Sequence, residues 1–528
     1  MSSKLARGSI ITFAGNIIFR VGGYIYRFLM ASLLGPTNYG IVGLTLPFQG
    51  IFQILSAGGL PPAIAKYVSE YKALNYDDLA NQTVHTALKI MAFLGILMGL
   101  LMVFFVGPWL GDLLHKPEAV LAFQAVGLIT PFSVIVGAYR GAFQGVYKME
   151  YILYTRAVEQ LFMTLFAVIF IVVGLSAFGA VLGSSVGFAL SALSAYIIFK
   201  RYMGEYLPPI SSDFVFTRRD ELKLAGKLVT YAIPVTVSAL AEMAIYSACT
   251  IIMGYFLSST LIGYYTAADP IGRLPLMISS SLATTILPAV SEAFALKDKI
   301  LLEKYVTNAY KYGMIFVVPM CVGIALLSQA IMSVVYFTDA SYVTGAGALA
   351  ILVVGMTFYS VFTISSSIVQ GIGNPRIPMY VLLLGTVVTV GLGFYLIPIN
   401  GINGGAFSIT FASLVMMIPM LAITFRITKT KIPFKFFAKI VAASLIMGIP
   451  ILFLPQNLIG IIIGIIICPI IYLVLLVLFK TLNSEDIGLA RDYSNKLGPL
   501  SKFSNRIIDI VEKYSWFLFF YYFFVNYY

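Results

Sequence analysis

The chain has 528 residues, of which 60% are hydrophobic and only 11% are charged, and its mean hydropathy is +0.94. Soluble globular domains average roughly 45–50% apolar and about 25% charged residues, so this composition excludes a water-soluble globule and indicates a chain embedded in lipid. The formal net charge of +12 does not require a nucleic-acid partner, because membrane proteins retain lysine and arginine on their cytoplasmic side.

Fourteen apolar runs are long enough to cross a bilayer, which takes about 20 residues of helix. In chain order they lie at 8–34, 40–62, 85–110, 119–144, 151–174, 178–199, 228–257, 260–289, 308–335, 344–370, 377–398, 402–425, 436–454 and 457–479. Lys4 and Arg7 precede the first run, which has no small-residue cleavage site after it. We therefore expect an uncleaved first helix.

Basic residues alternate between the loops that join these runs. With the N-terminus placed in the cytoplasm, the even-numbered loops hold nearly all of them, most densely at 200–227 and 426–439, and Lys116 is the clear exception. Because basic residues stay inside during insertion, we predict a multi-pass protein of the cell membrane with both termini in the cytoplasm. Twelve spans would place the termini on the same side, so an error of two spans stays open.

Three short motifs recur at a nearly constant distance along the chain. Asn38–Gly40 with Pro47 reappears as Leu261–Gly263 with Pro270, Val68–Glu70 reappears as Val290–Glu292, and Phe143–Gly145 reappears as Val369–Gly371. A shared shift of this kind predicts two related lobes of six helices each. Both lobes begin on the same side of the membrane, so the repeat is parallel.

The repeat divides the chain into five predicted parts. They are a first six-helix lobe at 1–203, a cytoplasmic linker at 204–227, a second six-helix lobe at 228–426, two appended membrane helices at 427–480, and a cytoplasmic or interfacial tail at 481–528. The predicted fold class is therefore an all-α integral membrane protein.

Polar and charged residues within the spans indicate a substrate cavity, because a charge at the bilayer centre costs about 2.5–3.5 kcal/mol unless it faces water or a partner. Arg20 and Arg27 are seven residues apart and hence on one face of the first span. The residues that we expect to line the cavity with them are Asn16, Tyr24, Gln49, Gln53, Asp269 and Arg273. Arginine suits a diphosphate, because its planar guanidinium donates paired hydrogen bonds to phosphate oxygens.

Several of these residues also have a structural alternative. Arg20 could form an internal salt bridge with Glu242, and Arg27 could extend toward the headgroups. Asp269 and Arg273 could form a buried pair within one helix. Glu242 has no local partner in the sequence, which makes it the candidate for coupling transport to a proton or a sodium ion.

Three further charges surround the short fourth loop. Arg140 precedes this loop and Arg156 follows it, which favours a role as basic anchors at the membrane surface. Glu159 is three residues after Arg156, a spacing at which one side chain neutralises the other on a helix.

No catalytic or metal-binding set stands out. The three cysteines and two histidines are isolated from one another, so we predict no metal site. The chain lacks a Walker loop, a helical zinc-protease motif and a nucleophile elbow. We therefore expect neither an enzyme nor any cofactor beyond a coupled proton or sodium ion.

Two N-terminal motifs and one later turn resemble a known family. Leu34–Gly40 (LGPTNYG) followed by Gly58–Tyr71 (GGLPPAIAKYVSEY) is similar to polysaccharide flippases of the multidrug/oligosaccharidyl-lipid/polysaccharide exporter superfamily, especially the O-antigen flippase and stage V sporulation protein B-like branches. Gln370–Pro375 (QGIGNP) resembles a turn that these proteins carry after helix 10. The resemblance covers about residues 1–480 and implies the MATE-like fold, with two six-helix lobes and two extra helices.

The resemblance also implies a function. A two-lobe transporter of this kind alternates between inward-open and outward-open states, and it moves a polyprenyl-diphosphate-linked oligosaccharide from the cytoplasmic to the outer leaflet for glycan biosynthesis. In lipid II flippases, arginines on helices 1 and 8 meet the diphosphate, and Arg20, Arg27 and Arg273 lie on matching helices here. The implied partners are this glycolipid and membrane lipids. We expect the protein to act as a monomer or beside glycan polymerisation or transfer machinery.

A different transport function is the alternative. Glu242 and Asp269 are acidic residues within spans, which would suit a cation-coupled exporter of drugs or other small molecules from the same superfamily. Multidrug exporters of the superfamily often carry an acidic residue in helix 1, whereas this chain carries arginines there.

Overall fold

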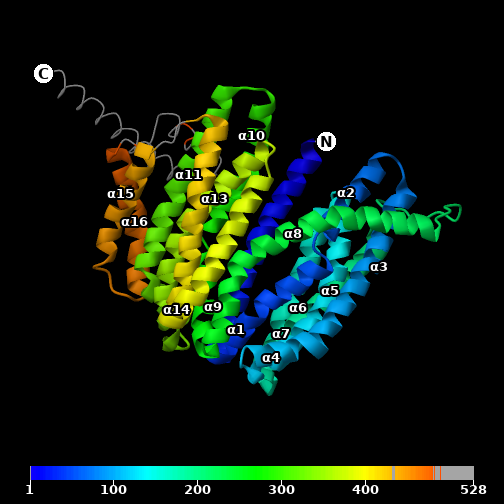
Figure 1. The fold of residues 1–528 in the computed structure, drawn as a ribbon, viewed down its shortest axis with the longest axis horizontal. Helices are drawn as coiled ribbons and strands as arrows, with labels where there is room; N and C mark the ends of the chain where they lie inside the picture. The colour runs from blue at the N-terminus through cyan, green and yellow to red at the C-terminus, as the bar shows by residue number, and fades with distance from the viewer. Residues whose placement is uncertain (1, 431–433, 480, 482–487, 489–490, 492–528) are drawn as a thin grey trace. The chain divides into compact units, whose positions relative to one another are not determined.

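The computed structural model describes residues 2–479 except 431–433, together with residues 481, 488 and 491. For residues 2–21 it describes the helix and not the side chains. Nearly all of the tail predicted at 481–528 therefore lies outside the described residues. Within them the secondary structure is helical and contains no strand (Figure 1).

The described residues form sixteen α-helices. They are α1 (Ser2–Ser56), α2 (Leu60–Ala73), α3 (Asp77–Leu101), α4 (Gly107–Leu113), α5 (Val120–Gly145), α6 (Met149–Phe170), α7 (Ser176–Tyr202), α8 (Arg218–Phe256), α9 (Ser259–Gly272), α10 (Leu276–Ala295), α11 (Lys299–Leu326), α12 (Ser328–Val335), α13 (Ala346–Gly371), α14 (Arg376–Thr428), α15 (Phe434–Ile451) and α16 (Leu458–Leu478). Short helical turns of other types lie at Met102–Val106, Pro117–Ala119, Ile171–Leu175 and Ala340–Gly345.

Eleven helical stretches among the described residues are long and apolar enough to cross a membrane. Three of them, Gly22–Ala73, Met149–Tyr202 and Arg376–Thr428, exceed fifty residues, although about 20 residues span a bilayer. Each of the three contains a glycine with a positive φ at which the helix breaks. If each is divided there, the eleven stretches become fourteen segments; the number of crossings itself stays a prediction.

Two of these breaks show why glycine is needed. Gly35 has a φ of 66° and Gly401 has a φ of 57°, values in the left-handed region that L-residues with a side chain rarely adopt. Gly35 is followed by Pro36, which lacks the backbone N–H that a continuous helix would use. The sequence therefore ends the first span of α1 at Gly35 and starts the next at Pro36.

By its packing the chain divides into two units. The first contains Met1–Pro270, Thr338–Gly345 and Leu382–Ile409, and the second contains Ile271–Phe337, Ala346–Val381 and Thr410–Tyr528. This division differs from the lobes predicted at 1–203 and 228–426, because α8 packs against α1, α2 and α3 and so joins the first unit. The predicted lobe boundaries follow the sequence repeat and stay predictions.

The core of the first unit surrounds α5. This helix packs against α2, α3 and α7, and α6 packs against α7. Fully buried side chains at the centre include Ile64, Met91 and Phe143. Burial of apolar side chains against one another in this way holds the helices in fixed positions, so polar side chains on their facing surfaces are held in place as well.

The second unit has its own core around α11 and α13. These helices pack against each other and against α10, and α15 packs on α11. The Tyr472 hydroxyl on α16 donates a hydrogen bond of 2.9 Å to the Ile315 carbonyl on α11. The last two spans are thus attached to α11 by a buried apolar surface and a buried polar contact.

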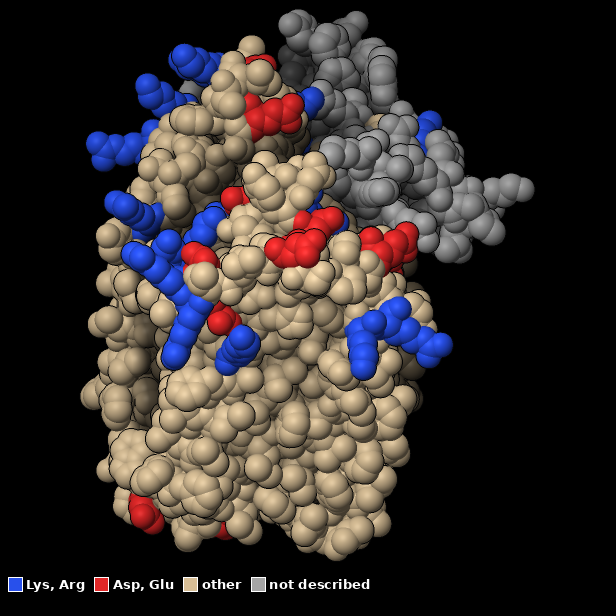
Figure 2. Space-filling model, turned by 90° about the vertical axis from the view of Figure 1, so that its right-hand side faces the viewer, with Lys and Arg blue, Asp and Glu red and all other residues tan. Residues whose placement is uncertain are grey.

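The charged surface is uneven. On the face that Figure 2 shows, the visible lysine and arginine side chains of the described residues stay clear of the lowest part, which shows acidic side chains at its edge. This distribution is the one that retention of basic residues on a single side of a membrane produces.

Candidate functional site: an arginine-lined pocket in the first unit

The first unit contains a pocket of about 480 Å³, a size within the range of small-molecule sites. Its walls come from the end of α1, from α2 and from facing stretches of α5, α6 and α7. The lining residues are Gln53, Ile54, Ala57, Gly58, Pro61, Ser133, Val134, Gly137, Arg140, Arg156, Glu159, Gln160 and Phe188. The polar half of this lining belongs mainly to α5 and α6.

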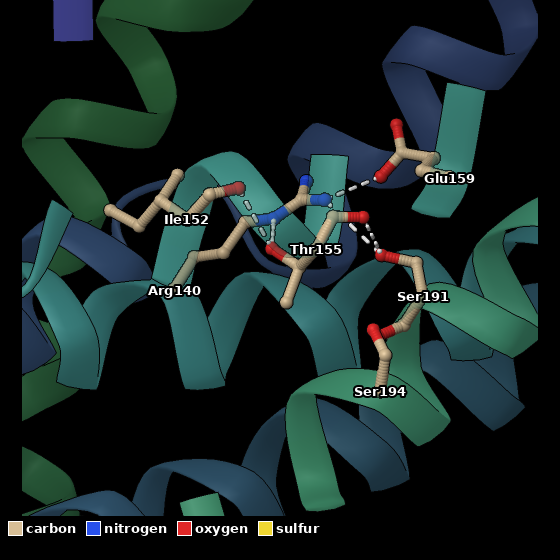
Figure 3. Close-up of polar contacts among 6 residues, drawn as sticks. All are labelled: Arg140, Ile152, Thr155, Glu159, Ser191 and Ser194. Carbon is tan, nitrogen blue, oxygen red and sulfur yellow. Dashed lines mark hydrogen bonds and ion pairs between the residues drawn. The ribbon is translucent and has the colours of Figure 1, made fainter. Parts of the chain in front are cut away.

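Arg140 donates hydrogen bonds to three side chains around the pocket (Figure 3). One of its terminal guanidinium nitrogens donates to Glu159 Oε2 at 2.6 Å and to Ser191 Oγ at 3.2 Å, and its Nε donates to Thr155 Oγ1 at 3.0 Å. Thr155 and Glu159 are four residues apart on α6, so they face α5 together. Ser191 also donates to the Thr155 carbonyl at 2.9 Å. Arg140 therefore joins α5, α6 and α7 at one point.

This arrangement changes the interpretation of the charges around the fourth loop. Glu159 pairs with Arg140 of the neighbouring helix, a partner that spacing along a single helix did not reveal. Arg140 and Arg156 both line the pocket, which differs from the expected role as membrane anchors. The short connection at 146–148 could have indicated this pairing from the sequence. It makes α5 and α6 antiparallel neighbours, so residues at similar distances from the connection lie close together.

The pocket carries a surplus of positive charge and of hydrogen-bond donors. Arg140 and Arg156 contribute two guanidinium groups and Glu159 contributes one carboxylate. The Gln53 side-chain nitrogen is buried and has no hydrogen-bond partner among the described residues. A buried amide without a partner costs free energy, so an acceptor supplied by a ligand would stabilise it. These groups together suit a ligand with anionic or oxygen-rich groups.

Gln53 is the predicted cavity residue that lines this pocket. Tyr24, on α1, donates a hydrogen bond of 3.1 Å to the Pro270 carbonyl on α9. Arg27 lies three residues after Tyr24 on α1, and Asp269 directly precedes Pro270 on α9. These predicted residues therefore fall at two places in the first unit.

The remaining predicted residues lie elsewhere. Asn16 and Arg20 belong to α1, but their side chains are outside the described residues. Gln49 is half-buried on α1 and does not line the pocket, and Arg273 is half-buried between α9 and α10. The Glu242 side chain on α8 is exposed. The roles assigned to these residues stay predictions.

The two copies of the repeat meet within the first unit. A Cβ atom on Gly40 would overlap the carbonyl oxygen of Ser259, and a Cβ atom on Gly263 would overlap the carbonyl oxygen of Pro36. The two clashes are the same clash viewed from each copy, because Gly40 corresponds to Gly263 and Pro36 corresponds to Ser259. Glycine at both positions lets the starts of these helices pack backbone against backbone.

Lys116, the exception to the charge pattern, is part of this region. Its side chain is buried, and its ammonium nitrogen donates to the Leu257 carbonyl at the C-terminal end of α8 at 2.6 Å. A positive charge there also opposes the negative end of the helix dipole. Glu118 accepts a hydrogen bond of 3.1 Å from Ser259 at the start of α9. The buried hydrogen bond to Leu257 accounts for Lys116. Its presence in an odd-numbered loop therefore does not require that loop to be cytoplasmic.

A sequence profile described as polysaccharide biosynthesis protein matches residues 5–294, which is more than half of the chain. The chain belongs to this family. A second profile, described as MatE, matches residues 234–395. Within the superfamily named above, the chain lies in the polysaccharide and lipid flippase branch, which confirms the resemblance of its N-terminal motifs.

Curated relatives cover most of the chain. An uncharacterized membrane protein of Methanocaldococcus jannaschii is 26% identical over 80% of this chain and 98% of its own length. The lipid II flippase MurJ of Bacillus subtilis is 22% identical over 76% of this chain and 79% of its own length. These relatives agree with a multi-pass membrane protein, and the second is a transporter by name.

Solved structures confirm the fold class. A structure of the lipid II flippase MurJ in an inward closed conformation matches with a TM-score of 0.72 and 18% identity, covering 90% of this chain and 98% of that one. At this level of identity the match shows a shared fold. The prediction of an all-helical, MATE-like membrane protein is therefore confirmed.

Proposed function

We propose that the protein translocates a lipid-linked glycan, carried on a polyprenyl diphosphate, from the cytoplasmic to the outer leaflet of the cell membrane. The observation that carries this proposal is the pocket of the first unit, where two arginines and an amide nitrogen without a hydrogen-bond partner line one cavity in a chain of the polysaccharide biosynthesis family. The relative named as a lipid II flippase supports the same substrate class.

The chemistry of the pocket fits the polar part of such a substrate. Guanidinium groups bind diphosphate oxygens through charge-assisted hydrogen bonds. The amides of Gln53 and Gln160 and the hydroxyl of Ser133 suit sugar hydroxyls, which both donate and accept. Two of its lining residues, Arg140 and Arg156, lie near the ends of α5 and α6 that residues 146–148 connect, and the charge pattern of the loops predicts this side to be cytoplasmic. The headgroup would therefore enter from the leaflet on which lipid-linked glycans are assembled.

Arg140 and Arg156 have different roles in this proposal. Arg140 is bonded to three side chains on two neighbouring helices, so it shapes the pocket and holds Glu159 in place. Arg156 is exposed at the pocket wall and is the group that meets the anionic part of the substrate. Glu159 limits the net positive charge, so that the headgroup can leave again on the other side.

Lipid analysis in the native cell tests this function. Deletion of the protein should cause a lipid-linked glycan to accumulate on the inner leaflet, where it stays protected from enzymes added outside the cell. Wild-type protein should reverse the accumulation, whereas an Arg156→Gln variant at equal abundance should not. Normal outer-leaflet glycan in the deletion strain, with no related transporter to replace it, would contradict the proposal.

The match to the MatE profile favours a second candidate, an exporter of small molecules. That function predicts resistance to cationic compounds on overexpression and a pocket with acidic character. The pocket of the first unit has two arginines and one glutamate, so its electrostatic potential repels organic cations. Efflux of a fluorescent cation from vesicles that contain the protein would support this second candidate.

A further inference from the structure

Two lysines and three tyrosines form a cluster where α2 meets the first part of α8. The Lys66 ammonium lies 4.7 Å from the ring centre of Tyr67 and 4.8 Å from that of Tyr231. The Lys227 ammonium lies 4.5 Å from the ring centre of Tyr67 and 5.1 Å from that of Tyr71. Both ammonium groups therefore share the ring of Tyr67. We refer to Lys66, Tyr67, Tyr71, Lys227 and Tyr231 as the lysine–tyrosine cluster.

The aromatic part of the cluster is a fixed base. Tyr67 and Tyr71 are four residues apart on α2, and their rings stack with centroids 6.1 Å apart. The Tyr231 ring on α8 meets Tyr67 edge-on at 6.0 Å. Tyr67 and Tyr71 are only 5% and 8% exposed. Packing between α2 and α8 thus fixes the tyrosine rings, and the rings in turn keep the two ammonium groups in position.

The ammonium groups themselves remain accessible. Lys66 and Lys227 are both exposed, and Lys227 donates a hydrogen bond of 3.0 Å to the Tyr71 hydroxyl. The nearby acidic group is Glu70, whose Oε1 is 4.0 Å from the Lys227 ammonium. One carboxylate against two ammonium groups leaves the cluster positive. Two like charges held at one ring repel each other, and an anion that bridges them relieves this repulsion.

The repeat provides an internal comparison. Val68–Glu70 corresponds to Val290–Glu292 in the second copy, and with the same shift Lys66, Tyr67 and Tyr71 correspond to Pro288, Ala289 and Ala293. The second copy of this helix therefore folds without the lysine and both tyrosines. These side chains are not required by the shared scaffold, which leaves a role specific to the first copy.

Two other lysines, one on α2 and one on α3, show the ordinary arrangement. Lys72 pairs with Asp77 at 2.7 Å, and Lys89 pairs with Glu221 at 2.7 Å. Each of these lysines has a carboxylate at hydrogen-bond distance. The cluster instead places its ammonium groups over aromatic faces, which hold a cation in position without neutralising its charge.

The cluster lies close to the pocket along the same helix. Pro61 on α2 lines the pocket, and Lys66 is five residues further on, about 7.5 Å along the helix axis at 1.5 Å per residue. We propose that the lysine–tyrosine cluster captures the diphosphate of the lipid-linked substrate at the cytoplasmic surface before the headgroup enters the pocket. This inference rests on the proposed function, and it assigns a first binding step to residues outside the pocket.

Direct binding of inorganic pyrophosphate tests the cluster. The probe is titrated into the full-length protein in nanodiscs of zwitterionic lipid. A Lys66→Gln/Lys227→Gln variant should bind at least about tenfold more weakly, since it loses two charge-assisted contacts. The control Lys72→Gln/Lys89→Gln removes the same charge from two paired lysines and should change affinity by less than about twofold. Equal losses in the two double variants would overturn the proposal.

Two further variants separate capture from a loss of folding. Lys66→Arg/Lys227→Arg keeps both charges and should retain pyrophosphate binding, and Glu70→Gln removes the competing carboxylate and should strengthen it. Weaker binding by Glu70→Gln would overturn the proposal. A loss of binding by the arginine variant with an unchanged melting temperature would do the same, because two cations at these positions would then not suffice.

The source of the phosphate is resolved by vesicle composition. Vesicles with a polyprenyl diphosphate in zwitterionic lipid should bind the wild type more tightly than vesicles with an equal charge of phosphatidylglycerol, and pyrophosphate should compete. If phosphatidylglycerol binds equally well and pyrophosphate does not compete, the cluster is a general membrane anchor and the proposal is wrong.

Transport assays keep this test separate from the function itself. With a lipid-linked glycan as substrate, the Lys66→Gln/Lys227→Gln variant should raise KM and leave the maximal rate nearly unchanged, because capture precedes translocation. If the wild type binds pyrophosphate at the cluster but moves no lipid-linked glycan, the proposed function fails and the capture site stands. If it moves the glycan with an unchanged KM in the variant, the capture site fails and the function stands.

Discussion

The hydroxyl oxygens of Thr37 and Thr260 lie 2.9 Å apart, and the two residues are 223 positions apart in the chain. That separation is also the shift between Asn38–Gly40 and Leu261–Gly263. The two threonines are therefore the same residue of the repeat, and they meet where its two copies pack together. A contact of this kind is self-complementary, because each copy presents the same residue to the other.

Cysteines at Thr37 and Thr260 should form a disulfide in a background without the native cysteines. The reason is that the two side-chain oxygens are already within hydrogen-bond distance, which places the Cβ atoms near disulfide geometry. Cleavage in the intervening loop followed by a non-reducing gel measures the crosslink. A control pair of Thr37→Cys with Ser238→Cys, an exposed position on α8, should not crosslink.

A larger residue at Gly40 should open this contact. Its Cβ atom would overlap the Ser259 backbone, which has no flexible side chain to move aside, and overpacking of this kind costs about 1–3 kcal/mol. Gly40→Val should therefore reduce the rate of the Thr37–Thr260 crosslink severalfold. Gly23→Val places the same side chain on the same helix at a position with open space, and should leave the rate unchanged.

Much of the architecture was predictable from residue patterns, because lipid imposes a strong rule on composition. Apolar runs and basic loops indicated the spans, and the gap between the first two predicted spans, 8–34 and 40–62, contains Gly35, where the structure has a helix break. The pocket was harder to predict. Arg140 and Glu159 belong to different helices, and a charge pair between helices depends on how the helices rotate against each other. Lys116 was an exception to the charge rule for a similar reason, because its partner Leu257 is 141 residues away.

The Arg140–Glu159 pair should be strongly coupled in stability. Glu159→Gln leaves the half-buried Arg140 without its carboxylate and should cost about 1–3 kcal/mol. The double variant Arg140→Met/Glu159→Gln should cost less than the sum of the two single changes, because the second change removes a group already deprived of its partner. Thermal unfolding of the protein in detergent gives both values. Additive losses would mean that the two side chains act independently.

Lys116 makes a contribution that depends on pH. Burial lowers the pKa of Lys116 below its ordinary value, and the nearby Glu118 offsets part of this effect. Between the lowered pKa and the ordinary value near 10.5, the unfolded chain binds more protons than the folded one, so stability contributed by this residue rises with pH. The melting temperature of the wild type, relative to that of Lys116→Met, should therefore rise as the pH increases from neutral to alkaline. A difference that shrinks as pH rises would show that Lys116 is not buried in this way.

Flipping by the purified protein tests the central claim most directly. The protein is reconstituted into vesicles that carry a fluorescent lipid-linked glycan, and an added glycan-cleaving enzyme reports how much glycan reaches the outer leaflet with time. The wild type should translocate the glycan, Arg156→Gln should reduce the rate at least about tenfold, and Arg218→Gln on the exposed start of α8 should not. Equal rates for wild type and Arg156→Gln, or rates no faster than in protein-free vesicles, would contradict the account.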